Sequence, residues 1–193
     1  MGIFNRLFGF KKHTTGNKRS KYLPEEKDPV ALEFAKKFTQ RGGKFIHCDT
    51  QDEVFYYFNQ ILLENNWSRE AILCNSPVLS SFFKLSSSTK NPEALLIGCE
   101  YLIANKGSIL ICNRQIQEKK LAEIPVNLII VAKTSDFSPD VSAAMTAINK
   151  KYKDQLPTNI TTLNAFDPTK ENDFLSYGGN AKHLYLLLQE VNG

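Results

Sequence analysis

The sequence has no long hydrophobic run. None of its apolar stretches approaches the roughly 18 residues that a membrane-spanning helix needs. The first apolar group, Ile3 to Phe10, is interrupted by Asn5 and Arg6 and lacks a small-residue cleavage site, so we expect no signal peptide. Hydrophobic residues make up 42% of the 193 positions and charged residues 23%, which is typical of a globular protein with one domain.

Cysteine is scarce, and its spacing argues against an iron–sulfur site. No pair forms C-x-x-C, and the thiols are too far apart in the sequence for the clustered ligation that an iron–sulfur centre requires. Each cysteine lies in an apolar run that we predict to be a strand. We therefore expect buried free thiols and a reducing, cytoplasmic location. The four are Cys48, Cys74, Cys99 and Cys112.

Acidic residues are missing from the first 23 positions, which hold six basic ones. Removing these six from the 24 basic residues of the chain leaves 18 against 20 acidic residues, so the net charge of +4 belongs to the tail. The remainder has no general basic surface, and we expect no nucleic-acid partner. The six are Arg6, Lys11, Lys12, Lys18, Arg19 and Lys21.

The apolar residues of this tail recur at helical spacing. Residues 1–12 are therefore a candidate for weak contact with a membrane surface or a partner. The simpler interpretation is a mobile tail, or one that packs on its own domain. We divide the chain into a basic amphipathic tail and linker, residues 1–27, and one α/β domain, residues 28–193. The apolar tail residues are Ile3, Phe4, Leu7 and Phe8.

Helical patterns alternate with short apolar runs along the rest of the chain. This order predicts an α/β fold, an open, mostly parallel sheet with helices on both faces, and a ligand site beyond the carboxyl ends of the strands. Two apolar segments around the turn at residues 105–108 predict an added β-hairpin. The predicted helices follow Pro29, Thr50, Ser76 and Asp140, and the predicted strands cover residues 44–48, 71–75, 127–133, 159–166 and 184–189.

The common catalytic and nucleotide-binding motifs are missing. The sequence contains no G-x-G-x-x-G, no G-x-x-x-x-G-K-[ST], no H-E-x-x-H and no G-x-S-x-G. Its three histidines, His13, His47 and His183, are widely spaced and include no metal-ligand pattern. The residues therefore identify no catalytic group, and we expect no metal site.

The turn Asn105-Lys106-Gly107-Ser108 is the first candidate binding site. A glycine-containing turn can expose consecutive backbone N–H groups that form a concavity for an anion. Lys106 would add a positive charge and Ser108 a hydroxyl group. The alternative is a structural turn with a solvated lysine.

Four further residues are candidates. Gly178 and Gly179 would let the backbone approach a ligand closely, unless they lie in a flexible loop. Lys170 lies in a polar stretch, residues 168–173, whose alternative is a solvated loop. Glu100 is the acid inside the hairpin region. If buried, it would have a raised pKa suited to chemistry, but we expect a strand-edge glutamate that faces water.

Three segments together resemble the LUD-domain family of lactate-utilisation proteins (LutC, or YkgG): "GCEYLIANKGSILI", "IPVNLIIVAK" and "FDPTKENDFLSYGGNAKHLYLLL". The similarity extends from about Leu95 to Glu190, and the start of the domain resembles a short subgroup from Bacteroidetes-type bacteria. The resemblance implies a NagB/RpiA/CoA-transferase-like fold. It also implies an operon-encoded system that oxidises L-lactate to pyruvate, in which companion subunits carry the iron–sulfur clusters. We accordingly expect no directly bound cofactor.

The sequence departs from the family at its polar positions. Asn127 and Gly178 stand where the family has histidines, and Asn105 and Lys106 stand where it has an acid and a hydroxyl residue. The resemblance thus implies an accessory protein that binds a small anionic ligand, or a companion iron–sulfur subunit, with Asn127 as a hydrogen-bonding residue. The alternative is an enzyme of the same superfamily, such as a CoA transferase with Glu100 as nucleophile, or a folate cyclo-ligase type.

Overall fold

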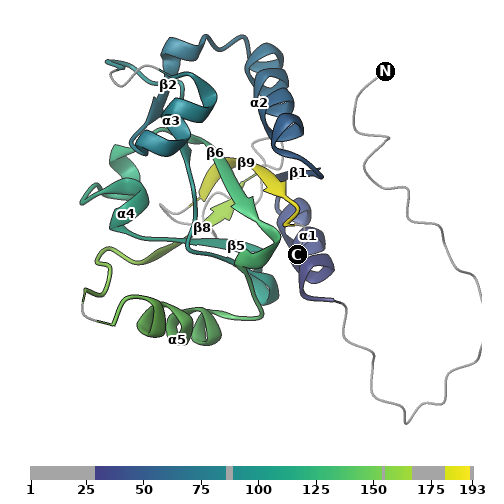
Figure 1. Cartoon of the computed structure of the whole chain (residues 1–193), viewed down its shortest axis with the longest axis vertical. Coiled ribbons are helices and arrows are strands. Elements are labelled where there is room, and N and C mark those ends of the chain that lie inside the picture. The colour runs from purple at the N-terminus through teal and green to yellow at the C-terminus, as the bar shows by residue number, and fades with distance from the viewer. Residues whose placement is uncertain (1–28, 86–88, 154, 167–180, 192–193) are drawn as a thin grey trace, which may run out of the picture.

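The computed structural model describes residues 29–85, 89–153, 155–166 and 181–191 (Figure 1). The α-helices of this part are α1 (Val30–Gln40), α2 (Gln51–Asn65), α3 (Pro77–Phe83), α4 (Asn113–Ile116) and α5 (Val141–Lys151). The strands are β1 (Lys44–Cys48), β2 (Ile72–Cys74), β3 (Ala94–Ile97), β4 (Tyr101–Ile103), β5 (Ser108–Ile111), β6 (Asn127–Lys133), β7 (Phe137–Ser138), β8 (Thr161–Ala165) and β9 (Ala181–Gln189).

The strands form one mixed, mostly parallel sheet in the order β2-β3-β6-β9-β8-β5-β4-β7. The long strand β9 lies at its branch point. One edge of β9 pairs with β6, and its other edge pairs with β8 near the amino end and with β1 over Tyr185–Gln189. All three pairings are parallel, so the predicted α/β class with a mostly parallel sheet is confirmed.

The predicted hairpin is present as β4 and β5, which are antiparallel and place Ile103 opposite Ser108. Its first arm is shorter than we expected. The apolar segment before the turn is split, because Ala94–Ile97 joins the parallel part of the sheet between β2 and β6. The break falls at Gly98, Cys99 and Glu100, and it changes the direction of the chain between the parallel sheet and the hairpin.

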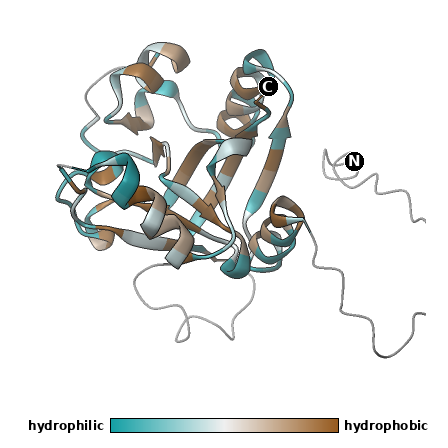
Figure 2. Ribbon diagram, turned by 60° about the horizontal axis from the view of Figure 1, so that its bottom comes forward, coloured by the Kyte–Doolittle hydropathy of each residue, from teal (hydrophilic) through white to brown (hydrophobic). Residues whose placement is uncertain are grey.

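Helices cover both faces of the parallel strands. Alternate residues of β6 point to opposite faces, so Leu128 and Ile130 pack with Phe34 of α1, and Ile129 packs with Phe58 of α2. The residue Ile148 of α5 packs with Leu110 on the hairpin. In Figure 1, α5 lies at the opposite end of the view from α2 and α3. Figure 2 shows the apolar colouring of the central strands between these helices.

Local side-chain caps explain why the helices begin where they do. The amide of Glu53 donates to the Oγ1 of Thr50 at 3.2 Å, and the amide of Ala143 donates to the Oδ1 of Asp140 at 2.8 Å. Each bond satisfies an amide that has no partner inside its helix. The predicted starts of α2 and α5 are confirmed.

The four cysteines are free, as we predicted, and Cys48, Cys74 and Cys112 are buried, whereas Cys99 is only partly buried. Cys48 and Cys74 lie in strands, but the prediction of a strand is wrong for Cys99 and Cys112, which follow the ends of β3 and β5. No helix in the described part of the chain is both long and apolar enough to span a membrane.

Candidate functional site

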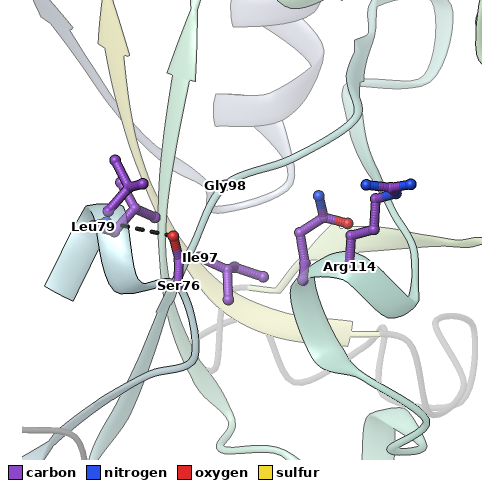
Figure 3. A pocket seen from close by; sticks show the side chains of 7 residues that line it. Ser76, Leu79, Ile97, Gly98 and Arg114 are labelled. Carbon is purple, nitrogen blue, oxygen red and sulfur yellow. Dashed lines mark hydrogen bonds between the residues drawn. The ribbon is translucent and has the colours of Figure 1, made fainter. Parts of the chain in front are cut away.

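A pocket of about 250 Å³ opens at the carboxyl ends of β2 and β3, which is the edge where we expected a ligand site. Figure 3 shows Ser76 and Leu79 on one side, Arg114 on the other, and Ile97 and Gly98 between them. The volume suits a small metabolite and is at the low end for ligand sites in proteins. The lining residues are Ser76, Val78, Leu79, Ile97, Gly98, Arg114 and Gln115.

Two short helices supply the polar residues of the pocket wall. Ser76 follows β2, and its Oγ accepts the amide of Leu79 at 3.4 Å, which caps α3. The other helix, α4, begins after Cys112 at the end of β5. Since α4 is a single turn, it places Arg114 and Gln115 next to each other at the pocket while Ile116 is fully buried beneath them.

A buried carboxylate lies behind this wall. Glu100 is 4% exposed and was expected to face water, so that expectation is wrong. Its Oε1 accepts the Nε2 of Gln115 at 3.0 Å. Its Oε2 accepts the Tyr152 hydroxyl at 2.9 Å and the Lys151 Nζ at 3.1 Å. The chain therefore compensates this buried charge with one cation and several hydrogen bonds.

The charge state of Glu100 follows from these contacts. Burial alone would raise its pKa, but the hydrogen bonds from Gln115, Tyr152 and Lys151 outweigh burial and lower the pKa. The prediction that a buried Glu100 would have a raised pKa is therefore wrong. Burial would lower the pKa of Lys151, yet its interactions with Tyr152 and Glu100 raise it. Glu100 and Lys151 are thus both ionised near neutral pH.

The thiol of Cys112 belongs to the same cluster. Its Sγ lies 3.2 Å from the Oε1 of Gln115 and 3.4 Å from the Oε1 of Glu100. Burial, together with the nearby Glu100 carboxylate, raises the pKa of Cys112 to about 11. Cys112 is therefore a neutral thiol that donates a weak hydrogen bond, and it is not a nucleophile at neutral pH.

Arg114 is the cation of the pocket wall. Its guanidinium carbon lies 4.2 Å from the ring centroid of Tyr152. Within the described part of the chain, this guanidinium forms no ion pair with an acid. An arginine fork in this setting can bind a carboxylate or phosphate through two parallel hydrogen bonds.

The structure places the predicted turn against α1. The amide of Asn105 donates to Pro139 O at 3.0 Å, and its carbonyl accepts the Nζ of Lys37 at 2.9 Å. Gly107 has a φ of +56°, and a Cβ there would come within 2.5 Å of the Phe38 nitrogen. Contacts with α1 and Pro139 therefore occupy part of the turn backbone that we predicted to bind an anion.

The side chains of the turn differ in exposure. Lys106 is exposed, whereas Ser108 is 1% exposed and its Oγ has no hydrogen-bond partner among the described residues. Neither residue lines the pocket at Arg114. The binding roles assigned to the turn stay predictions.

Asn127 lies at the amino end of β6, away from the pocket-lining end of β3. Its Nδ2 donates to Glu93 O at 2.9 Å, and its Oδ1 lies 3.0 Å from the Nδ1 of His183. Lys170, Gly178 and Gly179 fall outside the described residues, so their predicted binding roles stay predictions. Among the residues that the structure describes, no group of three or more His, Cys, Asp or Glu side chains is placed to hold a metal ion.

Sequence reasoning missed Arg114 and Gln115. They lie in a polar segment after β5 that carries no motif, and we treated that segment as a connection. The one available indication was Ser76-Pro77, a helix start directly after a strand, which marks the carboxyl edge of the sheet. The opposite wall of the pocket is the single-turn helix α4, which has no local sequence pattern. Its place beside Ser76 depends on how the strands are arranged in the sheet.

Fold and site together define an α/β protein with a small pocket at the carboxyl edge of a mostly parallel sheet. The sequence model of the LUD domain matches residues 83–187, more than half of the chain, so the chain belongs to the LUD domain family. The matched range contains Glu100, Arg114 and Gln115. The pocket residues on the α3 side, which precede residue 83, lie outside it.

A solved structure supports the fold. It is a DUF162 family protein from Deinococcus radiodurans, which is 15% identical in sequence, with a TM-score of 0.58. The similarity covers 83% of this chain and 96% of that chain. At this identity the likeness concerns the fold alone. No curated protein matches the sequence significantly.

Proposed function

We propose that the chain is an accessory protein of lactate or related organic-acid utilisation that binds a small carboxylate in the pocket at Arg114. Membership of the LUD domain family, which is associated with lactate utilisation, supports the metabolic setting. The single observation that supports a carboxylate ligand is Arg114, a pocket-lining residue whose guanidinium lies over the Tyr152 ring and forms no ion pair with an acid among the described residues. Val78, Leu79 and Ile97 offer an apolar surface for a short carbon chain.

Nuclear magnetic resonance titration of the full chain with sodium pyruvate and sodium L-lactate tests this proposal. We expect the amide resonances of Ser76, Gly98 and Gln115 to shift in a saturable way. Sodium chloride at equal ionic strength is the control for non-specific charge effects. Saturable shifts confined to residues 104–108 would instead place the ligand at the predicted turn, and the absence of saturable shifts would refute carboxylate binding.

We also propose a companion iron–sulfur redox subunit as the protein partner, because such subunits belong to the lactate-oxidising system that the family resemblance implies. Co-expression with iron–sulfur subunits encoded nearby, followed by size-exclusion chromatography, tests it. Co-elution supports the partnership and separate elution refutes it. Liposome sedimentation with and without residues 1–12 tests the further proposal of weak membrane contact.

One observation favours the alternative of a superfamily enzyme. Glu100 is an ionised carboxylate beside a pocket, which is what a CoA transferase would need as its nucleophile. Against this, both oxygens of Glu100 already accept hydrogen bonds, and its side chain is 2% exposed. Incubation with an acyl-CoA followed by mass spectrometry decides the matter. A covalent adduct that disappears in Glu100→Gln would establish the enzyme, and no adduct would leave binding as the function.

A further inference from the structure

We infer that the pocket at Arg114 prefers 2-oxo acids to 2-hydroxy acids, so that it binds the oxidised partner of such a pair more tightly. The inference rests on the proposed function and adds the class of carboxylate. It follows from the hydrogen-bonding capacity that the pocket side chains have left after their internal contacts are counted.

Two partners fix the orientation of the Gln115 carboxamide, because one of them can only donate a hydrogen bond and the other can only accept one. Its Oε1 accepts the backbone N–H of Cys112 at 2.8 Å, and an amide N–H can only donate. Its Nε2 donates to the Oε1 of Glu100 at 3.0 Å, and an ionised carboxylate can only accept. A flipped carboxamide would lose both bonds, so the carboxamide is held in one orientation.

This orientation decides what Gln115 can offer a ligand. Its Oε1 accepts the Cys112 amide at 2.8 Å, and the Cys112 sulfur lies 3.2 Å from the same oxygen. Its Nε2 carries two hydrogens, of which Glu100 takes one. Gln115 can therefore donate one further hydrogen bond to a ligand, whereas its oxygen already accepts the Cys112 amide and is covered by the Cys112 sulfur.

The other polar side chains of the wall add donors. The guanidinium of Arg114 carries five N–H groups and has no acceptor. Ser76 uses one lone pair for the Leu79 amide and keeps its hydroxyl hydrogen, so Ser76 is the member of the wall that can both donate and accept. The side chains lining this pocket thus present mostly hydrogen-bond donors.

A wall rich in donors distinguishes two closely similar ligands. The keto oxygen of a 2-oxo acid only accepts, so Gln115 and Arg114 can satisfy it together with the carboxylate. The hydroxyl group of a 2-hydroxy acid must also donate, and of the three polar side chains Ser76, Arg114 and Gln115 it is Ser76 alone that keeps a lone pair for this hydrogen. A donor left without an acceptor in a binding site weakens binding by about tenfold or more.

Isothermal titration calorimetry of the full chain with pyruvate, L-lactate and propionate tests the inference. The three acids share a charge and a chain length and differ at carbon 2. We expect pyruvate to bind about tenfold tighter than L-lactate, and propionate to bind more weakly than pyruvate. Equal or tighter binding of L-lactate would overturn the inference, since it would show that a main-chain carbonyl, Ser76 or water accepts the hydroxyl hydrogen.

The variant Gln115→Ala adds a second readout. Removing the donor should bring the affinities for pyruvate and L-lactate close together while carboxylate binding through Arg114 persists. An unchanged ratio in the folded variant would refute the role of Gln115. Binding of all three acids with equal affinity refutes the selectivity alone, whereas no binding of any acid refutes the proposed function and the inference with it.

Discussion

The Nε2 of Gln115 lies 3.0 Å from the Oε1 of Glu100, which joins the wall of the pocket to a carboxylate that is 4% exposed. On its other oxygen, Glu100 accepts hydrogen bonds from Tyr152 and Lys151 at the end of α5. The hairpin, α4 and α5 therefore meet at one side chain. A change that disturbs Glu100 should alter both the stability of this region and the orientation of Gln115.

Removing the cation beside Glu100 should destabilise the fold. In Lys151→Met the buried carboxylate loses its ion pair, and we expect the free energy of unfolding to fall by about 1–2 kcal/mol, a modest value because the Lys151 side chain is half exposed. Urea denaturation monitored by circular dichroism measures the change. Lys150→Met is the matched control, since Lys150 is exposed and forms no ion pair with a described residue. Equal stability of the two variants would contradict the role of Lys151.

The pKa of Glu100 predicts how stability depends on acid. Because contacts lower its pKa in the folded state, the charged form stabilises the fold above the ordinary carboxylate pKa, and this contribution disappears as pH falls through the lowered folded value. Wild type should therefore exceed Glu100→Gln in stability at neutral pH, and the difference should shrink on acidification. Unfolding curves between about pH 3 and pH 7 measure it. A difference that grows toward acid would show that the pKa is raised instead.

The turn before β5 requires glycine. Gly107→Ala should lower the free energy of unfolding by about 2 kcal/mol or more, because φ is positive and the new Cβ would meet the backbone of Phe38 at 2.5 Å. Gly98→Ala is the comparison, since its Cβ would come no nearer than 3.8 Å to the Val131 oxygen. We expect that variant to stay within about 1 kcal/mol of wild type. A lower melting temperature for Gly98→Ala than for Gly107→Ala would contradict this packing.

Local features of the fold could be predicted from the sequence because their causes are local. Thr50 and Asp140 cap the helices that follow them, and the burial of β6 on both faces follows from its nearly unbroken apolar run. The branching at β9 could not be predicted, because β1 and β8 share one edge of that strand from positions more than 110 residues apart in the sequence.

The candidate site was less predictable than the fold for the same reason. The buried state of Glu100 depends on donors from Gln115, Lys151 and Tyr152, which lie 15 to 52 positions further along the chain. The sequence pattern around Glu100 shows a hairpin residue and nothing of these partners. For Gly107 the sequence did show a glycine-containing turn. It did not show the packing against α1 that requires a glycine at this position.

The central claim is that Arg114 binds a small carboxylate, and titration of pyruvate into wild type and Arg114→Gln by calorimetry tests it most directly. Loss of the guanidinium should weaken binding about tenfold or more. Lys106→Ala and Lys150→Gln each remove one positive charge elsewhere, and both should keep the wild-type affinity within about twofold, since neither residue lines the pocket. Unchanged affinity in Arg114→Gln with a loss in Lys106→Ala would contradict the account and move the site to the turn at residues 105–108.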